Sequence, residues 1–294
     1  MMKPIPVESG YFTVLPNRRA NARGEVVWAM NELSPMILGP VLHGQPGLEP
    51  AENLENFHQF NKVFESEYDE ATGKVYAVWH KRRDSGYADR TPHRHKLGAT
   101  KAAHMKNAGI KAGGNVNKCL FSIFITPEGE ERRFDYVASR IFYCTFYERL
   151  ACKTSAMNKL VDALYVHHQG ILIAGYDARN LDDDEITHET IQQWYHDPSW
   201  PFGHEMVLHA ILYHWNDPDE LPWRKEAETR VRSLTTAEDS LQTRLGIHPP
   251  FRHIHSEQTS SLLMINLFNV LSVNILETRS PILFQALMPS NGTG

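Results

Sequence analysis

The sequence predicts an α+β fold: a predominantly helical single domain with a few short strands, followed by a helical C-terminal extension. Apolar residues make up 41% of the 294 residues and charged residues 22%, which is typical of a folded globular protein. Helical spacing of apolar residues is more extensive than strand-like alternation. After Asp217 and Pro218 the chain turns into a charged stretch with a sparse apolar stripe. We therefore expect a core domain over residues 1–217 and a helical extension over residues 218–294.

Short strands are predicted where apolar or alternating runs end at proline, glycine or asparagine. These runs cover residues 11–15, 26–30, 74–79, 119–125 and 171–176. Two proline- and glycine-rich segments, residues 34–41 and 43–50, are predicted to be loops. The first of them carries apolar side chains that can anchor it to the core.

Helices are predicted where apolar residues recur every three to four positions. The predicted helical segments are 54–64, 95–107, 135–168, 187–196 and 202–215. Residues 135–168 are expected to form two helices that meet near residues 153–155, with Thr154 or Ser155 as the N-cap. Thr187 is the expected N-cap of the next helix, because a threonine hydroxyl can accept a hydrogen bond from a free backbone N–H of the first turn.

The helix predicted to begin near Leu54 has two different faces. One face is apolar and carries Leu54, Phe57, Phe60 and Phe64; the other is polar and carries Glu55, Gln59 and Lys62. Offsets of four and then three residues return to the same side of a helix. An acid, an amide and an amine in one row fit the wall of a polar pocket. The same pattern also fits an ordinary solvated helix face.

A basic stretch lies between His80 and Lys111 and contains nine lysines and arginines but only two aspartates. A basic segment on an otherwise acidic chain favours an anionic partner such as a phosphate or a nucleic acid. Tyr87 is its only aromatic residue, so a stacking platform for single strands is poorly supported. A charged surface without a partner is the alternative. The first half of the stretch, with Gly86, is expected to be a loop.

Several common sites are excluded by their spacing. The chain contains no GxxxxGK[ST], GxGxxG or GxSxG motif. His204 and His209 are five residues apart, so on a helix they point in different directions and do not form a zinc-protease pair. No metal is expected.

The three cysteines form no CxxC pair, which fits a reducing compartment. No apolar run reaches the 18–20 or so residues of a membrane span. We therefore expect a cytoplasmic protein, or a nuclear one in a eukaryote, with no membrane partner.

Asp177 directly follows the apolar run that ends at Tyr176. A carboxylate at the end of a buried strand is partly withdrawn from water, and such carboxyls often serve in acid–base chemistry. The alternative is an aspartate that caps the following turn.

Several stretches together resemble the NADAR family, the YbiA-like N-glycosidases associated with NAD and ADP-ribose chemistry. Glu55-x-Phe57-x-Gln59-x-x-Lys62-x-Phe64 is similar to the signature E-[HN]-[YF]-x-Q-x-x-K-F of that family. Residues 33–40 take the place of its early loop, 146–177 of its helical segment with a strand and an acid, and 202–208 of its closing helix. The chain departs from the family in its longer basic stretch, in lacking a D-x-x-W-G element, and in having His204 and Glu205 where small and amide residues are usual.

The resemblance implies a hydrolase that cleaves the N-glycosidic bond between a base and a ribose phosphate or ADP-ribose, including ADP-ribose on nucleic acid bases. It implies Glu55, Asp177 and Lys62 as catalytic residues, and no cofactor. The substrate-binding residues would be Gln59, Phe57, Arg18, Arg19, Arg94 and Lys96. The ligand would be a phosphorylated nucleoside or an ADP-ribose-type molecule, with nucleic acid as a further candidate partner. The alternative is a nucleic-acid-binding protein without catalytic activity that uses residues 80–111.

Overall fold

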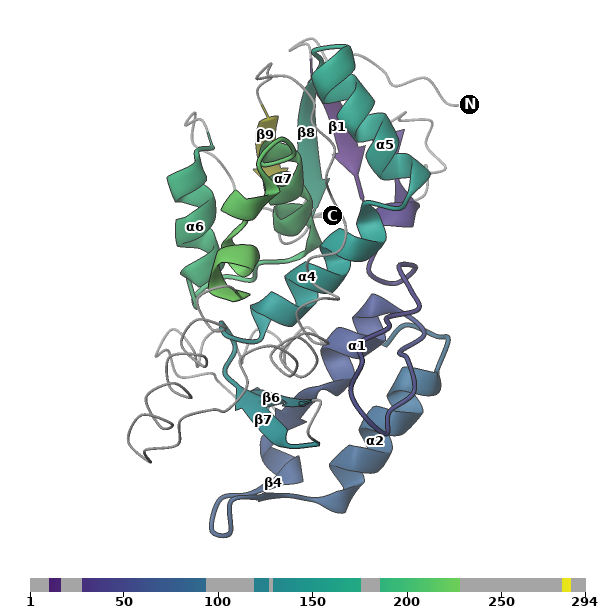
Figure 1. Cartoon of the computed structure of the whole chain (residues 1–294), viewed down its shortest axis with the longest axis vertical. Coiled ribbons are helices and arrows are strands. Elements are labelled where there is room, and N and C mark those ends of the chain that lie inside the picture. The colour runs from purple at the N-terminus through teal and green to yellow at the C-terminus, as the bar shows by residue number, and fades with distance from the viewer. Residues whose placement is uncertain are drawn as a thin grey trace, which may run out of the picture.

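The computed structural model describes residues 11–16, 28–93, 119–126, 129–175, 186–227 and 282–286. These residues form helices together with three small sheets, which confirms the predicted α+β class. Figure 1 shows two parts along the long axis, one around a parallel sheet and the other around a small antiparallel sheet. The long helix α4 (Arg140–Ala151) runs between them.

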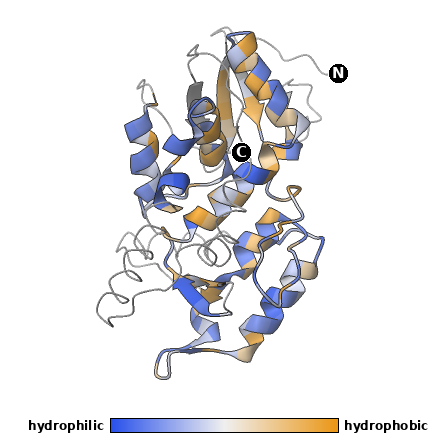
Figure 2. Cartoon of the chain, in the orientation of Figure 1, coloured by the Kyte–Doolittle hydropathy of each residue, from blue (hydrophilic) through white to orange (hydrophobic). Residues whose placement is uncertain are grey.

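A four-stranded parallel sheet organises the first part. Its strands are β1 (Tyr11–Leu15), β2 (Trp28–Ala29), β8 (Gly170–Gly175) and β9 (Ile282–Ala286), in the spatial order β2-β1-β8-β9. Strand β8 has a neighbour on each side, so its backbone is paired along both edges. It is coloured as strongly apolar in Figure 2, as expected for a strand buried on both faces.

Helices that follow β1 and β8 in the chain pack around this sheet (Figure 1). They are α5 (Ser155–Val161), a single π-helical turn η3 (Asp162–Val166), α6 (His188–His196), α7 (His204–Tyr213) and the short η4 (Pro218–Glu220). The predicted N-caps are confirmed: Thr154 accepts a hydrogen bond from the Met157 amide over 3.1 Å, and Thr187 accepts one from the Thr190 amide over 3.2 Å. Helix α7 packs against β8 and α4.

The second part holds the antiparallel sheet β3-β6-β7 and two helices. Its elements are α1 (Leu54–Phe60), β3 (Lys62–Phe64), η2 (Glu65–Glu67), β4 (Tyr68–Asp69), β5 (Lys74–Val75), α2 (Ala77–Ala88), β6 (Cys119–Ile125) and β7 (Glu131–Phe134). The short η1 (Asn31–Leu33) follows β2 and packs on α5 of the first part. Helix α1 packs on α2 and on α4, so it lies between the two parts.

Three local predictions for this part were wrong. The strand predicted for residues 74–79 ends at Val75, and the loop predicted for the first half of the basic stretch is the helix α2. Gly86, which suggested a loop, lies inside α2 because the ring of Phe60 occupies the space that a Cβ would need. The helix predicted to run to Phe64 ends at Phe60, and Lys62 begins a strand.

The main core continues beyond the predicted domain boundary at residues 217–218. Leu221, Trp223 and Ala227 are buried in the same cluster as the residues of α4 and α7. Strand β9, at residues 282–286, pairs with β8 in the main sheet. Hence residues on both sides of the boundary share one core. The segments 228–281 and 287–294 lie outside the described residues. No helix among the described ranges is both long and apolar enough to span a bilayer.

Candidate functional site

The polar row predicted for the helix at residue 54 is present, and two of its three side chains are buried. Gln59 donates a hydrogen bond from Nε2 to Oε1 of Glu55 over 2.8 Å, and Lys62 donates one from Nζ to Oε1 of Gln59 over 3.0 Å. Glu55 is 6% exposed, Gln59 is 8% exposed, and Lys62 is half-buried. The solvated-face interpretation is therefore wrong for Glu55 and Gln59. Placing a carboxyl and an amide out of water is costly, so a buried polar row of this kind needs a reason.

The loop before α1 fixes the start of the helix. Asn53 is the N-cap, and its side chain accepts a hydrogen bond from the Asn56 amide over 2.9 Å. The Leu54 and Glu55 amides, which have no partner within the helix, donate to carbonyls of residues 38 and 35, over 2.8 and 2.9 Å. Gly39 is required in this loop because a Cβ would overlap the backbone of residues 52–53. These contacts together fix the backbone at the start of α1, where Glu55 lies.

Phe57 lies on the back of α1, in the aromatic core. It is 1% exposed, and its ring lies 5.5 Å from that of His43 and 5.0 Å from that of Phe146. Substrate binding was expected for this residue. Its observed contacts are with core rings, which hold the helix in place.

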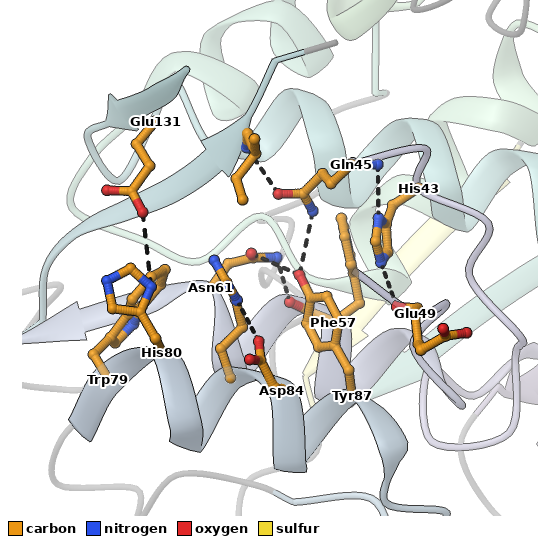
Figure 3. A network of polar contacts seen from close by, with 12 residues as sticks. His43, Gln45, Glu49, Phe57, Asn61, Trp79, His80, Asp84, Tyr87 and Glu131 are labelled. Carbon is orange, nitrogen blue, oxygen red and sulfur yellow. Dashed lines mark hydrogen bonds and ion pairs between the residues drawn. The ribbon is translucent and has the colours of Figure 1, made fainter. Parts of the chain in front are cut away.

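A polar network lies beside this core (Figure 3). Tyr87 donates a hydrogen bond to Oδ1 of Asn61 over 2.7 Å, and Asn61 in turn donates to the carbonyl of Phe57 over 2.7 Å. Gln45 donates to the Tyr87 hydroxyl over 3.3 Å. Burial raises the pKa of Tyr87, so its hydroxyl stays a neutral donor. The network connects α2 to the end of α1 and stabilises the turn between Gln59 and Lys62.

A second buried carboxyl, Glu205, lies in the first turn of α7 and is 1% exposed. Its Oε2 is 3.0 Å from Nδ1 of the neighbouring His204. Its carboxyl group packs on Gly175, the last residue of β8, so closely that a Cβ there would overlap it. The backbone of β8 therefore approaches Glu205 in a way that only glycine permits.

The pKa of Tyr143, on α4, is affected by both carboxyls. Burial raises its pKa well above the usual value, and the negative charges of Glu55 and Glu205 raise it further. The ring of Tyr143 lies 4.8 Å from that of His58 on α1. The phenol therefore remains protonated, and it lies within the electrostatic influence of two acids that are 150 positions apart in the sequence.

The sequence analysis missed Glu205 and Tyr143 as site residues. The segment at residues 204–209 was considered as a zinc pattern, which its spacing excluded, and as a departure from the closing helix of the NADAR family. A signal was available: His204 and Glu205 are the first two residues of an otherwise apolar helix, which indicates that a polar pair is buried at its start. Among the described residues, no group of three or more histidines, cysteines, aspartates and glutamates is placed to hold a metal ion.

Five predicted site residues lie outside the described ranges. They are Arg18, Arg19, Arg94, Lys96 and Asp177. The strand that was expected to deliver Asp177 is present as β8, and its described part ends at Gly175. Glu55, Gln59 and Lys62 are the predicted residues that the structure brings together.

The basic stretch is partly neutralised where it is described. Arg82 pairs with Glu67, with 2.5 Å between Nε and Oε1, and Arg83 pairs with Asp84, with 3.0 Å between Nε and Oδ1. Arg83 is also buried, at 4% exposure. These two arginines are therefore engaged within the protein. The second half of the stretch, residues 94–111, lies outside the described residues.

Comparisons of the chain with models of known protein families, with curated proteins and with solved structures found no match.

Proposed function

We propose that this protein is an N-glycosidase that hydrolyses the bond between a base and the ribose of a ribose phosphate or an ADP-ribose group. The observation that carries the proposal is the buried row of Glu55, Gln59 and Lys62, joined by hydrogen bonds of 2.8 and 3.0 Å. The carboxyl of Glu55 is only 6% exposed and accepts a hydrogen bond from the Gln59 amide, so its role is not to keep the protein surface soluble. The resemblance of residues 55–64 to the NADAR signature supports the same conclusion.

The chemistry of this reaction suits the row. Breaking the C1′–N bond leaves positive charge on the sugar, and a nearby carboxylate stabilises that charge and accepts a proton from the attacking water. Glu55 takes this role. Gln59 orients Glu55 through its Nε2 donor, and Lys62 holds a phosphate of the substrate or engages the opened sugar. Arg18, Arg19, Arg94 and Lys96 remain proposed phosphate ligands, and Asp177 remains a proposed second acid.

The substrate we propose is a phosphorylated nucleoside or an ADP-ribose-type molecule, free or attached to a base in nucleic acid. Such molecules occur in the cytoplasm, and in the nucleus of a eukaryotic cell, which is where we place the protein. The reaction as written uses water and side chains alone, so no cofactor is part of the proposal.

The test is base release, measured by mass spectrometry. Purified protein is incubated with an oligonucleotide that carries ADP-ribosylated guanine, with NAD, and with ribosylated-pyrimidine phosphates. We expect the wild type to free a base from at least one of them and Glu55→Gln to free none, at an unchanged melting temperature. Glu65→Gln is the matched control, because Glu65 is exposed and lies on η2.

An absence of cleavage with the whole panel would contradict the proposal. If the oligonucleotide is then bound in a salt-sensitive way that survives Glu55→Gln, the non-catalytic nucleic-acid-binding alternative takes its place, because phosphate contacts weaken steeply with ionic strength.

A further inference from the structure

We propose that Trp79 and Arg82 of α2 are positioning residues for the polar row, because they hold the backbone of Lys62 where its side chain reaches Gln59. This inference rests on the proposed function and deepens it. It also gives Arg82, which belongs to the basic stretch, a role inside the protein in place of a contact with nucleic acid.

The carbonyl oxygen of Lys62 accepts two hydrogen bonds from α2. Nε1 of the Trp79 indole donates one over 2.9 Å, and Nη2 of Arg82 donates the other over 2.6 Å. A carbonyl oxygen has two lone pairs, so these two donors use its full capacity. Trp79 is 0% exposed, so water does not compete for its hydrogen bond. The backbone of Lys62 is therefore tied to α2 at one defined point.

Arg82 is itself held in place by Glu67. Nε and Nη2 of Arg82 donate to the two carboxylate oxygens of Glu67 over 2.5 and 2.9 Å, and such two-point pairs fix the orientation of a guanidinium. The Glu67 carboxylate in turn accepts a hydrogen bond from the Phe64 amide over 3.1 Å. One guanidinium thus connects the first residue of β3, through the Lys62 carbonyl, with the last residue, through Glu67.

The first two side chains of β3 point to opposite faces, because side chains alternate along a strand. Val63 is fully buried and packs in one cluster with Trp79 and Ile123. Lys62 therefore lies on the other face, where its Nζ donates to Oε1 of Gln59 over 3.0 Å. The Trp79 indole thus fixes both the Lys62 carbonyl and the neighbouring Val63 side chain. Together these contacts set the direction in which the lysine side chain leaves the strand.

A continuous path of printed hydrogen bonds leads from α2 to the proposed catalytic carboxyl. It passes through Lys62 and Gln59 and ends at Glu55. Loss of the contact with α2 leaves Lys62 in the protein but lets its side chain move away from Gln59. A misplaced group near the reacting atoms lowers the rate even when no catalytic group is removed. We therefore expect weaker catalysis that depends on Lys62.

Trp79→Phe tests this role, because it keeps an aromatic ring in the cluster and removes a donor to Lys62. Trp223→Phe is the matched control: Trp223 is also 0% exposed, and its Nε1 donates to Glu148 over 2.7 Å in the main core. Both changes remove one buried indole hydrogen bond, so both should lower the melting temperature. A general loss of stability affects both variants, whereas misplacement of Lys62 affects only the first.

Base release is measured for each variant in the presence of Lys62 and in a Lys62→Met background. We expect Trp79→Phe to lower kcat/KM about threefold to thirtyfold when Lys62 is present, the range of coupling between contacting residues, and less than about twofold in Lys62→Met. Trp223→Phe should stay within about twofold in both backgrounds. An equal loss with and without Lys62 would show that Trp79 has only a structural role and would overturn the inference.

The NMR signal of the Lys62 ε carbon gives a second readout, which needs no activity. It is the signal that Lys62→Met removes from protein with isotopically labelled lysine. We expect it to move toward the signals of exposed lysines in Trp79→Phe and to keep its position in Trp223→Phe. This readout decides the question if Lys62→Met is too inactive for the kinetic comparison.

Arg82→Lys replaces Trp79→Phe in both measurements if Trp79→Phe does not fold. It keeps a positive charge beside Glu67, but one ammonium group does not reproduce the planar geometry with which the guanidinium bonds both Glu67 and the Lys62 carbonyl. The same Lys62-dependent loss of kcat/KM and the same movement of the Lys62 signal are expected.

The outcomes separate the two proposals. If the wild type cleaves nothing in the panel, the proposed function fails and this inference fails with it. If the wild type cleaves a substrate and Glu55→Gln does not, the proposed function stands. In that case, an unmoved Lys62 signal or a wild-type kcat/KM in Trp79→Phe overturns this inference alone.

Discussion

The amide group of Gln59 has one orientation, because its nitrogen donates to Glu55 over 2.8 Å while its oxygen accepts from Lys62 over 3.0 Å. The negative group of Glu55 and the positive group of Lys62 thus bind opposite ends of the Gln59 amide. Gln59 acts as a rigid spacer that keeps the acid and the amine apart while holding both in place.

The spacer role predicts the effect of Gln59→Leu, which keeps the volume and removes both hydrogen bonds. We expect base release to fall about tenfold to a hundredfold, because Glu55 loses the donor that orients it, and stability to fall by about 1–3 kcal/mol. Kinetics and urea denaturation measure the two effects. A variant with the activity of the wild type would show that Gln59 does not position Glu55.

Gly175→Ala is expected to displace the Glu205 carboxyl, since the new Cβ would overlap it. Overpacking a closed core costs about 1–3 kcal/mol. The melting temperature, measured by thermal denaturation, should therefore fall.

The double variant Gly175→Ala/Glu205→Asp serves as the control for that change. Its shorter acid relieves the overlap, so the double variant should melt at a higher temperature than Gly175→Ala alone. Equal melting temperatures would count against the close contact.

Arg140 fastens α4 to the end of α6. Arg140 is 5% exposed, and its guanidinium donates to four backbone carbonyls, those of Trp194, Tyr195, Asp197 and Trp200. Arg140→Lys keeps the charge but cannot reach all four, so we expect a loss of about 3 kcal/mol in the free energy of unfolding. Chemical denaturation measures it. A loss below about 0.5 kcal/mol would contradict this role.

His209 of α7 makes the fold sensitive to acid. Burial lowers its pKa to about 3, and the charge of His214 contributes in the same direction. Below pH 6.5, the ordinary value, the unfolded chain binds a proton that the folded chain does not, so stability falls as the pH falls toward 3. The loss is at most about 1.4 kcal/mol per pH unit for this histidine.

Denaturation midpoints at pH 7.5 and pH 5 measure this dependence. His209→Leu should be less sensitive to pH than the wild type between those values, whatever its absolute stability. An equal slope in both proteins would show that His209 does not carry the effect.

Local signals in the sequence predicted local structure well. The caps at Thr154 and Thr187 and the strands predicted at residues 119–125 and 171–176 depend on neighbours in the sequence. The caps are confirmed, and the strands are present as β6 and as β8, which covers Gly170–Gly175. Helix α2 was not predicted, because Gly86 suggested a loop. In the folded protein the ring of Phe60, which is far away in the sequence, fills the space beside Gly86, so a glycine is needed inside the helix.

The candidate site was likewise only partly predictable from the sequence. Glu55 and Gln59 lie four residues apart on α1, so helical geometry was enough to predict their contact. Lys62 lies on β3, beyond the end of the helix, and still reaches Gln59. Glu205 and Tyr143 come from α7 and α4, and only the packing of these two helices brings the charge of Glu205 within reach of Tyr143. No periodicity in the chain expresses that convergence. The burial of Trp223, which lies beyond the predicted boundary at residue 217, also depends on contacts with distant residues, such as its hydrogen bond to Glu148.

The most direct measurement compares Glu55→Gln with Glu65→Gln on the best substrate of the panel. Both variants make the same chemical change within one short segment, one at a buried position and the other at an exposed one. We predict that kcat/KM falls about 10³-fold in Glu55→Gln and stays within twofold in Glu65→Gln, with both proteins folded at the assay temperature. A Glu55→Gln protein that is folded and retains more than a tenth of the wild-type activity would contradict the account.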